Sequence, residues 1–532
     1  MVKNYLRSAI RNFSKNKGFS FLNIFGLAIG IASSLLIMQY VKYERSYDTF
    51  NNHSERIYRI QYNNYSNGEV IFECAAAVPA AGPALKENFV EVIEQVRLLP
   101  RGAVVSFDDP VMGLASFREV NNIQVTESSV FNIFNVEFIS GNPETCINGG
   151  GKVAISAKVA EKYFGKTDAI GRTITFDGDN DFEVTAVFAD IPSNSHIKFD
   201  FLISQDYFNQ WFPDGDWQDN WGWYDHNTYV LLDEGVDYLE LQSRWDDYLL
   251  EVRGESWETN NYRQEFILQP LLDIHLYSNL LQESEPAEQG DANAVYFLTI
   301  IAFFILLIAW VNYINLSTAK SMERANEVGV RKVMGANKHQ LTIQFMTEAF
   351  LLNLTAAIIG VIMVFLSWPF FSELTGREIA FTMIYDGQFW TVVAVLFIGG
   401  TLLTGFYPAL VISSFRPVLV LKGKIFKSAE GVFLRKSLVV FQFTVSVVLI
   451  AGTIIVLQQL SFMRNKDLGI NINQTLVIKG PGITDSTYTD KLESYKTETN
   501  RLPGVLGMTA SSNVPGNEIF WTRGIRRISG FT

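Results

Sequence analysis

Five long, mostly apolar runs without charged residues limit how this chain can fold. They are residues 18–41, 292–318, 349–372, 387–415 and 437–463. A helix needs about 20 apolar residues to cross a bilayer, and each run is long enough. Only 18% of the residues are charged, below the roughly 25% of a soluble domain. Since a soluble protein rarely contains five such helices, the sequence predicts a membrane protein with an α-helical transmembrane bundle.

Lysine and arginine near the ends of these runs predict the orientation, because they are enriched on the cytoplasmic side. Five bases and no acid precede the first run, and more bases lie within 319–348 and 416–436. The connection 373–386 has one base, Arg377, and three acids. The N-terminus is therefore expected in the cytoplasm, with residues 42–291 and everything after about residue 464 outside.

The large external segment is strongly acidic. Residues 42–291 hold 42 Asp and Glu against 17 Lys and Arg, whereas the rest of the chain is basic. Such a charge repels nucleic acid, so nucleic-acid binding is not expected. The first apolar run has 24 residues, more than the roughly 7–15 of a signal-peptide core. We therefore interpret it as a retained anchor.

Local patterns in the external segment predict a mixed α/β domain. Residues 157–163 have a helical pattern that Gly165 closes, and alternating residues on both sides of Asp177-Gly178 predict a hairpin. Four tryptophans within residues 211–224 suit aromatic packing, or a surface that stacks on a sugar or peptide. Cys74 and Cys146 lie outside the membrane, where a disulfide is chemically allowed but not required.

The layout suggests a repeat, because "YLRSAIRNF" leads into the first span and "FLRKSLVVFQF" leads into the fifth. The second copy is expected to be incomplete, as a fragment or a natural truncation. The predicted domains are a cytoplasmic amphipathic N-terminus (1–17), spans 18–41, 292–318, 343–372, 387–415 and 437–463, an external domain (42–291), cytoplasmic connections 319–342 and 416–436, and the beginning of a second external domain (464–532).

No arrangement of residues indicates catalysis, a cofactor or a metal. Gly165-Lys166-Thr167 resembles the end of a phosphate-binding loop, but Ala160 stands where the pattern needs a glycine. Residues 177–183 space their acids like a calcium loop without its glycine, so a hairpin turn explains them better. The five histidines do not cluster at metal-ligand spacing. Glu348, at the cytoplasmic end of the third span, is either functional or snorkels to water.

The charged stretch 321–341, between the second and third spans, predicts two helices with a sharp break. Glu327 precedes Arg331 by four residues, the favourable order for an ion pair. Gly335 suits the left-handed residue that ends a helix. Asn337 with Gln340 forms a capping-box pattern that starts the next helix. This pair of helices is either a stiff cytoplasmic lever or an inert connector whose positive charge only fixes the membrane topology.

This stretch resembles a known family. "MERANEVGVRKVMGA" is similar to the cytoplasmic signature of FtsX/MacB-type ABC transporter permeases. "YERSYDTFNNHSERIYRI", "VFADIPSNSHIKFDFLIS" and "GFYPALVISSFRPVLVLKGK" match further segments of the family in its order, strongest for the variant with two repeats and a MacB-like periplasmic domain. The residues that match or accompany the signature are Arg324, Glu327, Val328, Gly329, Arg331, Lys332, Gly335 and Ala336.

The resemblance implies a multi-pass permease subunit of the inner membrane, without catalysis of its own and with a periplasmic domain. ATP and Mg²⁺ would bind a separate cytoplasmic ABC ATPase, whose movements the signature helix would pass to the outer domain. Further implied partners are membrane lipid, a periplasmic adaptor or an outer-membrane channel. The working unit would be a pseudo-dimer of repeats or a homo-oligomer.

Two functions of different class fit this pattern. The first is export or extraction of a substrate by mechanical transmission. The second is signalling without transport, in which the chain controls a cell-wall hydrolase or senses a peptide. A third interpretation, an anchored carbohydrate receptor, rests on the tryptophan-rich stretch alone and leaves the other four spans unexplained.

Overall fold

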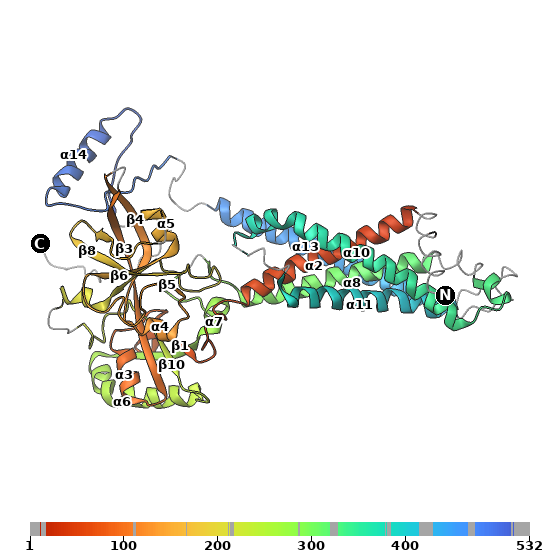
Figure 1. Ribbon diagram of the computed structural model, residues 1–532, viewed down its shortest axis with the longest axis horizontal. Coiled ribbons are helices and arrows are strands. Elements are labelled where there is room, and N and C mark those ends of the chain that lie inside the picture. Colours follow the sequence, from red (N-terminus) through yellow and green to blue (C-terminus); the bar gives the residue numbers. More distant parts are fainter. Residues whose placement is uncertain are drawn as a thin grey trace, which may run out of the picture. The chain divides into compact units, whose positions relative to one another are not determined.

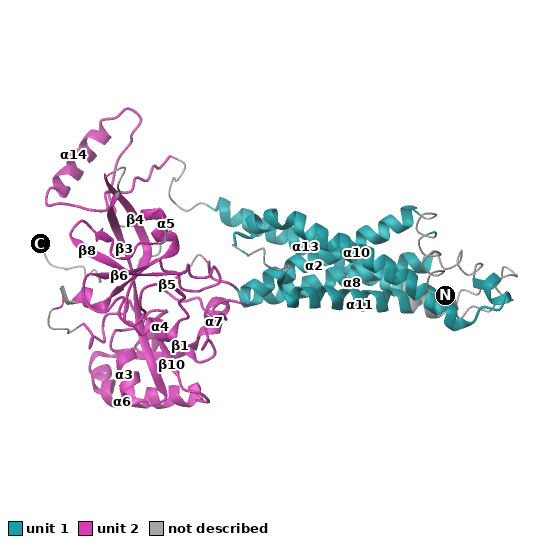
Figure 2. Ribbon diagram, viewed as in Figure 1, with its two compact units in different colours: residues 1–45, 291–470 teal, residues 46–290, 471–532 magenta. Residues whose placement is uncertain are grey.

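The computed structural model describes most of the chain: residues 11, 17–109, 113–165, 168–210, 212, 217–285, 288–319, 328–377, 379, 385–413, 429–466, 474–511 and 514. The chain divides into two compact units, shown in different colours in Figure 2. Unit 1 contains residues 1–45 and 291–470, and unit 2 contains residues 46–290 and 471–532.

Unit 1 is a bundle of long apolar helices. Each contains a stretch long and apolar enough to cross a membrane, as the sequence predicts. They are α2 (Lys17–Glu44), α8 (Ala292–Ala319), α10 (Lys338–Thr375), α11 (Gly387–Ser413) and α13 (Ala429–Asn465). Figure 1 shows them running side by side. These helices make the chain a helical membrane protein.

Four of these helices share one apolar core, to which Leu27 of α2, Leu306 of α8, Leu352 of α10 and Leu396 of α11 contribute. Small residues allow close approach: a Cβ on Gly30 would lie 2.7 Å from Ala309 Cβ. The apolar stretch of α13 has no buried part among the described residues.

Unit 2 is built on one mixed sheet with strand order β11-β1-β10-β3-β4-β9-β6-β8-β5, with β2 beside β1 and β7 beside β3 and β8. The strands are β1 (Ile57–Ser66), β2 (Glu69–Cys74), β3 (Val92–Asp109), β4 (Gly113–Thr126), β5 (Phe138–Ser140), β6 (Lys152–Ser156), β7 (Thr173–Phe176), β8 (Asn180–Phe188), β9 (Phe201–Ser204), β10 (Asn227–Leu232) and β11 (Tyr262–Pro270). Its helices are α3 (Ala81–Asn88), α4 (Val130–Ile133), α5 (Ala157–Phe164), η1 (Gln205–Gln210), α6 (Tyr238–Asn260), α7 (Leu271–Tyr277) and α14 (Tyr488–Asn500).

Local signals in the sequence explain two of these elements. The Ser156 side chain caps α5 by accepting from Val159 N, and Gly165 ends the helix in the left-handed conformation. The turn between β7 and β8 has positive φ at both Asp177 (52°) and Gly178 (85°), the conformation that matches the twist of a tight hairpin. The predicted helix and hairpin are both present.

Other sequence features of unit 2 serve packing. Trp217 is 2% exposed and packs against Phe208, and Trp221 packs edge-on against Phe266. This supports aromatic packing for the tryptophan-rich stretch. Cys74 and Cys146 are both free and buried, so the optional disulfide is not formed. Lys166 and Thr167 lie outside the described residues.

Candidate functional site

In the connection between α8 and α10, the described residues 328–333 are helical, and this segment, here called the short helix, ends as its sequence predicts. Ala336 N donates to Arg331 O and Gly335 N donates to Lys332 O, both at 3.0 Å. Gly335 has φ +94°. These two bonds and the left-handed glycine form the Schellman ending of a helix, which satisfies carbonyls that a helix end leaves unpaired.

The next helix begins two residues later. Asn337 is the N-cap of α10, with both hydrogen bonds of a capping box present. In one of them Asn337 N donates to Gln340 Oε1 at 3.1 Å. The predicted break between Gly335 and Asn337 is therefore confirmed. The hydrogen bonds at both ends lie within residues 331–340, so the break is a defined bend rather than loose chain.

The short helix packs against the first turns of α10. Val328, Leu341 and Phe345 form a buried apolar cluster. Beside it, Arg331 Nη1 donates to Gln344 Oε1, and Gln344 Nε2 donates to Glu348 Oε1 at 3.4 Å. A polar path therefore joins the short helix to the interior of the bundle.

Glu348 is 5% exposed and Gln344 is 7% exposed. The Glu348 side chain is therefore almost fully buried, and whether it is functional stays a prediction. A buried carboxylate is costly unless its oxygens accept hydrogen bonds, and Gln344 supplies one of them. Through Gln344, Glu348 is linked by hydrogen bonds to Arg331 of the short helix.

The opposite face of the short helix is apolar and open. Val330, Val333 and Met334 are 49%, 65% and 82% exposed. Positions i, i+3 and i+4 lie on one helix face, so these side chains form a continuous patch, here called the apolar lever face. Large apolar side chains grouped at a surface often mark a contact with another protein.

The predicted site residues occupy distinct places around this helix. Val328 and Gly329 are buried, and Arg331 binds Gln344. Burial and the neighbouring Lys338 lower the pKa of Lys332. Gly335 and Ala336 form the helix ending. Arg324 and Glu327 lie outside the described residues, so the predicted pair of Glu327 with Arg331 stays a prediction. The lever face was missed, although its i, i+3, i+4 apolar spacing is visible in the sequence.

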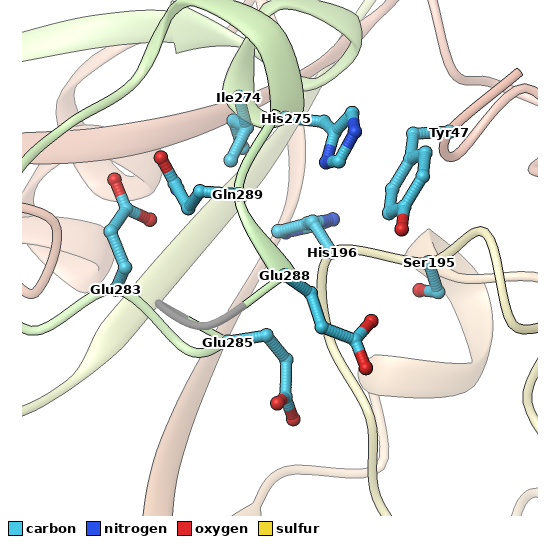
Figure 3. Close-up of a pocket in the computed structure, with 9 residues that line it drawn as sticks. All are labelled: Tyr47, Ser195, His196, Ile274, His275, Glu283, Glu285, Glu288 and Gln289. Atoms are coloured by element: carbon cyan, nitrogen blue, oxygen red, sulfur yellow. The ribbon is translucent and has the colours of Figure 1, made fainter. Parts of the chain in front are cut away.

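A second candidate is a small polar pocket in unit 2 (Figure 3). It is lined by Tyr47, Ser195, His196, Ile274, His275, Glu283, Glu285, Glu288 and Gln289. In the part of the chain that the structure describes, no group of three or more His, Cys, Asp or Glu could hold a metal ion.

The adjacent serine and histidine in this pocket do not form a nucleophile pair. Ser195 Oγ donates to Asp48 Oδ1 at 3.2 Å. His196 Nδ1 lies 2.8 Å from Asp48 Oδ2, and His196 Nε2 lies 2.8 Å from the Tyr229 hydroxyl. A hydrolytic triad needs the imidazole to face the serine hydroxyl. Here both ring nitrogens are engaged elsewhere, so the arrangement is that of a structural contact.

Two family models match this chain. The MacB-like periplasmic core domain matches residues 20–248, and the FtsX-like permease C-terminal domain matches residues 299–417, which include the short helix and Glu348. This chain belongs to the MacB/FtsX-like family of ABC transporter permeases.

Curated relatives of this permease are themselves named as permeases. It is 23% identical over 247 residues to the ABC transporter permease YknZ of Bacillus subtilis, covering 46% of this chain and 53% of that protein. It is 28% identical over 130 residues to the macrolide export ATP-binding/permease protein MacB of Sodalis glossinidius, covering 24% of this chain and 19% of that protein. The match thus spans about half of the first relative and less of the second.

Solved structures similar to the permease include a permease domain from Porphyromonas gingivalis, with 22% identity, a TM-score of 0.35, and coverage of 41% of this chain and 91% of that chain. Another is the periplasmic region of MacB from Actinobacillus actinomycetemcomitans, with 11% identity, a TM-score of 0.28, and coverage of 39% and 87%.

Proposed function

We propose that this permease is the non-catalytic membrane subunit of an ABC transporter, coupling ATP hydrolysis by a partner ATPase to movement of its own outer domain. The apolar lever face carries this proposal. Val330, Val333 and Met334 are exposed, while the opposite face of the same helix is packed on α10. A helix with one face packed on the bundle and an apolar face open suits a docking contact with a second protein.

The short helix, here called the lever, has contacts that would transmit a displacement to the helix bundle. Its end is fixed by the Schellman bonds at Gly335 and by the capping box at Asn337. Movement of the short helix would reach α10 through Val328 and through the path from Arg331 to Gln344 and Glu348. From α10 it would reach α2, which packs so closely that a Cβ on Gly360 would lie 3.1 Å from Ile31 Cγ2. The chain of α2 then continues into unit 2.

The proposal includes the orientation. Bases flank the lever, so it would lie in the cytoplasm with the N-terminus, where ATP and Mg²⁺ would bind the partner ATPase. Unit 2 would lie in the periplasm and perform export or extraction of a substrate. The family membership and the membrane helices support an ABC ATPase partner and an inner-membrane location.

Single substitutions in the lever face test the proposal. Val333→Asp and Met334→Asp place a charge on the docking surface and leave the packed face intact. Val90→Asp is the matched control, because Val90 is 95% exposed in unit 2. We would purify the full chain in detergent, label co-purifying proteins with photoreactive 8-azido-ATP, and identify them by mass spectrometry.

We expect one ATP-labelled ABC ATPase with the wild type and with Val90→Asp, and a loss of at least about tenfold with either lever variant, because an interface anchor costs about 1.4 kcal/mol or more when disrupted. Equal recovery with all variants would reject the lever face as the docking surface. If no labelled ATPase accompanied any of them, the proposed function itself would fail.

A further inference from the structure

The last turn of α2 carries two opposite charges, Lys42 and Glu44, at the end from which the chain enters unit 2. Both are paired with the connection between α10 and α11. Lys42 Nζ pairs with Asp386 Oδ2, and Glu44 Oε1 lies 3.1 Å from Arg377 Nε. All four residues belong to unit 1.

The two pairs differ in burial. The side chains of Glu44 and Arg377 are 1% and 13% exposed, whereas those of Lys42 and Asp386 are 42% and 26% exposed. A buried charge must keep its partner, because an unpaired charge in a low-dielectric surrounding is strongly unfavourable. An exposed pair is weaker and can open under modest perturbation. The Glu44–Arg377 pair therefore resists separation, whereas the Lys42–Asp386 pair can open.

Both partners on the connection are held firmly. Arg377 directly follows Gly376, the left-handed C-cap of α10, and its carbonyl accepts from Ser372 Oγ at 2.8 Å. Asp386 Oδ1 accepts from Gln388 N at 2.9 Å in the first turn of α11. The hydrogen bond from Lys42 holds the pKa of Asp386 below its usual range. Asp386 is therefore charged at neutral pH.

The two pairs have opposite polarity. Along α2 a positive charge precedes a negative one, and each meets its opposite beside the end of a different helix. Reversing the charge of any one of these residues would place two like charges together, which is unfavourable.

We infer that these two ion pairs form a latch, here called the outer latch, which holds the outer end of α2 to the connection between α10 and α11 until the lever moves. This inference rests on the proposed function, in which α2 passes movement to unit 2. The latch sets the resting position of α2. Opening of Lys42 from Asp386 comes first, and the buried pair limits how far α2 can travel.

Charge reversal tests the latch. The variants are Lys42→Asp, Asp386→Lys and the double exchange Lys42→Asp with Asp386→Lys, which restores a pair of opposite polarity. Lys466→Asp is the matched control, because Lys466 is an exposed lysine directly after a long apolar helix, α13. The full chain would be reconstituted in lipid nanodiscs, with nitroxide labels at Arg45→Cys and Gln388→Cys, both exposed positions, and Cys74 and Cys146 replaced by alanine.

Dipolar electron paramagnetic resonance would then report the separation of the two labels. We expect a longer, broader distance component in either single variant, with a roughly two- to fivefold larger open fraction, because an exposed ion pair contributes modestly. The double exchange should return the wild-type distribution, and Lys466→Asp should leave it unchanged. Higher salt should increase the open fraction of the wild type, because salt screens the partly exposed pair.

Unchanged distances in both single variants would overturn the latch, as would a double exchange that opens more than either single variant. A second measurement separates this result from the proposed function. If the distances follow the expected pattern but no ATP-labelled ATPase co-purifies with any form, the latch stands and the proposed function fails. If the ATPase co-purifies and the distances do not respond, the latch alone fails.

Discussion

The guanidinium of Arg59 on β1 is fully buried against the carboxylate of Glu283, with Arg59 Nη1 2.6 Å from Glu283 Oε2. Arg59 Nη2 also donates to Ser278 Oγ at 2.8 Å and to Gln269 Oε1 at 2.7 Å. These bonds pin the segment that leads from α7 toward α8 onto the sheet of unit 2. The pair is therefore a fixed point at which that segment is anchored to the outer domain.

Removing one partner of this pair should destabilise unit 2 strongly. Glu283→Ala leaves the Arg59 charge buried without its carboxylate, so we expect a loss of about 3–5 kcal/mol in the free energy of unfolding. Glu234→Ala is the control, because Glu234 is 86% exposed and lies 3.8 Å from Arg56; its change should stay within about 0.5 kcal/mol. Denaturant unfolding followed by tryptophan fluorescence measures both. Equal midpoints for the two variants would contradict the anchoring role.

The same pair should make stability depend on acidity. Burial raises the pKa of Glu283, but Arg59 and Ser278 outweigh this effect, so its pKa lies below the ordinary value. The stabilisation is therefore complete above the unfolded-state pKa of about 4.3 and is lost as the pH falls toward the lower folded-state value. Unfolding at pH 7 and at pH 4 should show a smaller difference for Glu283→Gln than for the wild type. An identical difference would refute the linkage.

The sequence correctly predicted those helices and turns that depend on residues close together in the chain. Helix length and apolar content identified the five spans, and the glycine and asparagine at positions 335 and 337 identified the break before α10. Asp177 and Gly178 likewise identified the hairpin between β7 and β8. In each case the deciding residues lie within one or two turns of chain, where capping, turn conformation and periodicity act.

Relationships between distant residues could not be predicted in this way. Arg59 and Glu283 are 224 positions apart, and Lys42 and Asp386 are 344 apart. Nothing in the spacing of a single sequence states that they meet. The strand order of unit 2 is hidden for the same reason, because β4 and β9 pair in parallel across an intervening segment. The apolar lever face is different, because its i, i+3, i+4 spacing is local and visible in the sequence. It was not predicted because charged residues surround it in the stretch 321–341.

The left-handed conformation of Gly335 predicts a graded response to substitution. Gly335→Asn should be tolerated, because asparagine adopts positive φ at moderate cost, whereas Gly335→Val should strain the helix ending by about 1–2 kcal/mol or more. We expect Gly335→Asn to retain co-purification of the ATP-labelled ATPase and Gly335→Val to reduce it severalfold. Gly235→Val is the control, since Gly235 also has positive φ (78°) but lies in unit 2. Equal recovery with Gly335→Val and the wild type would show that the helix ending is not required.

The two cysteines should react with thiol reagents only after unfolding. Burial raises the pKa of Cys74 to about 12 and that of Cys146 to about 11, and both thiols are free. The reactive thiolate is therefore scarce at pH 8 as well as inaccessible. Titration with a chromogenic disulfide should find no thiol in the native protein and two in denaturant without reductant. One or no thiol after denaturation would indicate a covalent modification or a disulfide.

Gln344 joins the lever to Glu348, so its removal should uncouple the lever without preventing docking. Gln344→Leu keeps the approximate size of the side chain but removes one acceptor for Arg331 and one donor to Glu348. ATPase co-purification should stay within about twofold of the wild type, because the lever face is unchanged. The movement of α2 on addition of ATP, read from the label pair at Arg45 and Gln388, should fall severalfold. Gln458→Leu on the exposed surface of α13 is the matched control and should keep the full movement. A Gln344→Leu variant that moves as the wild type does would show that the movement does not depend on the path through Gln344.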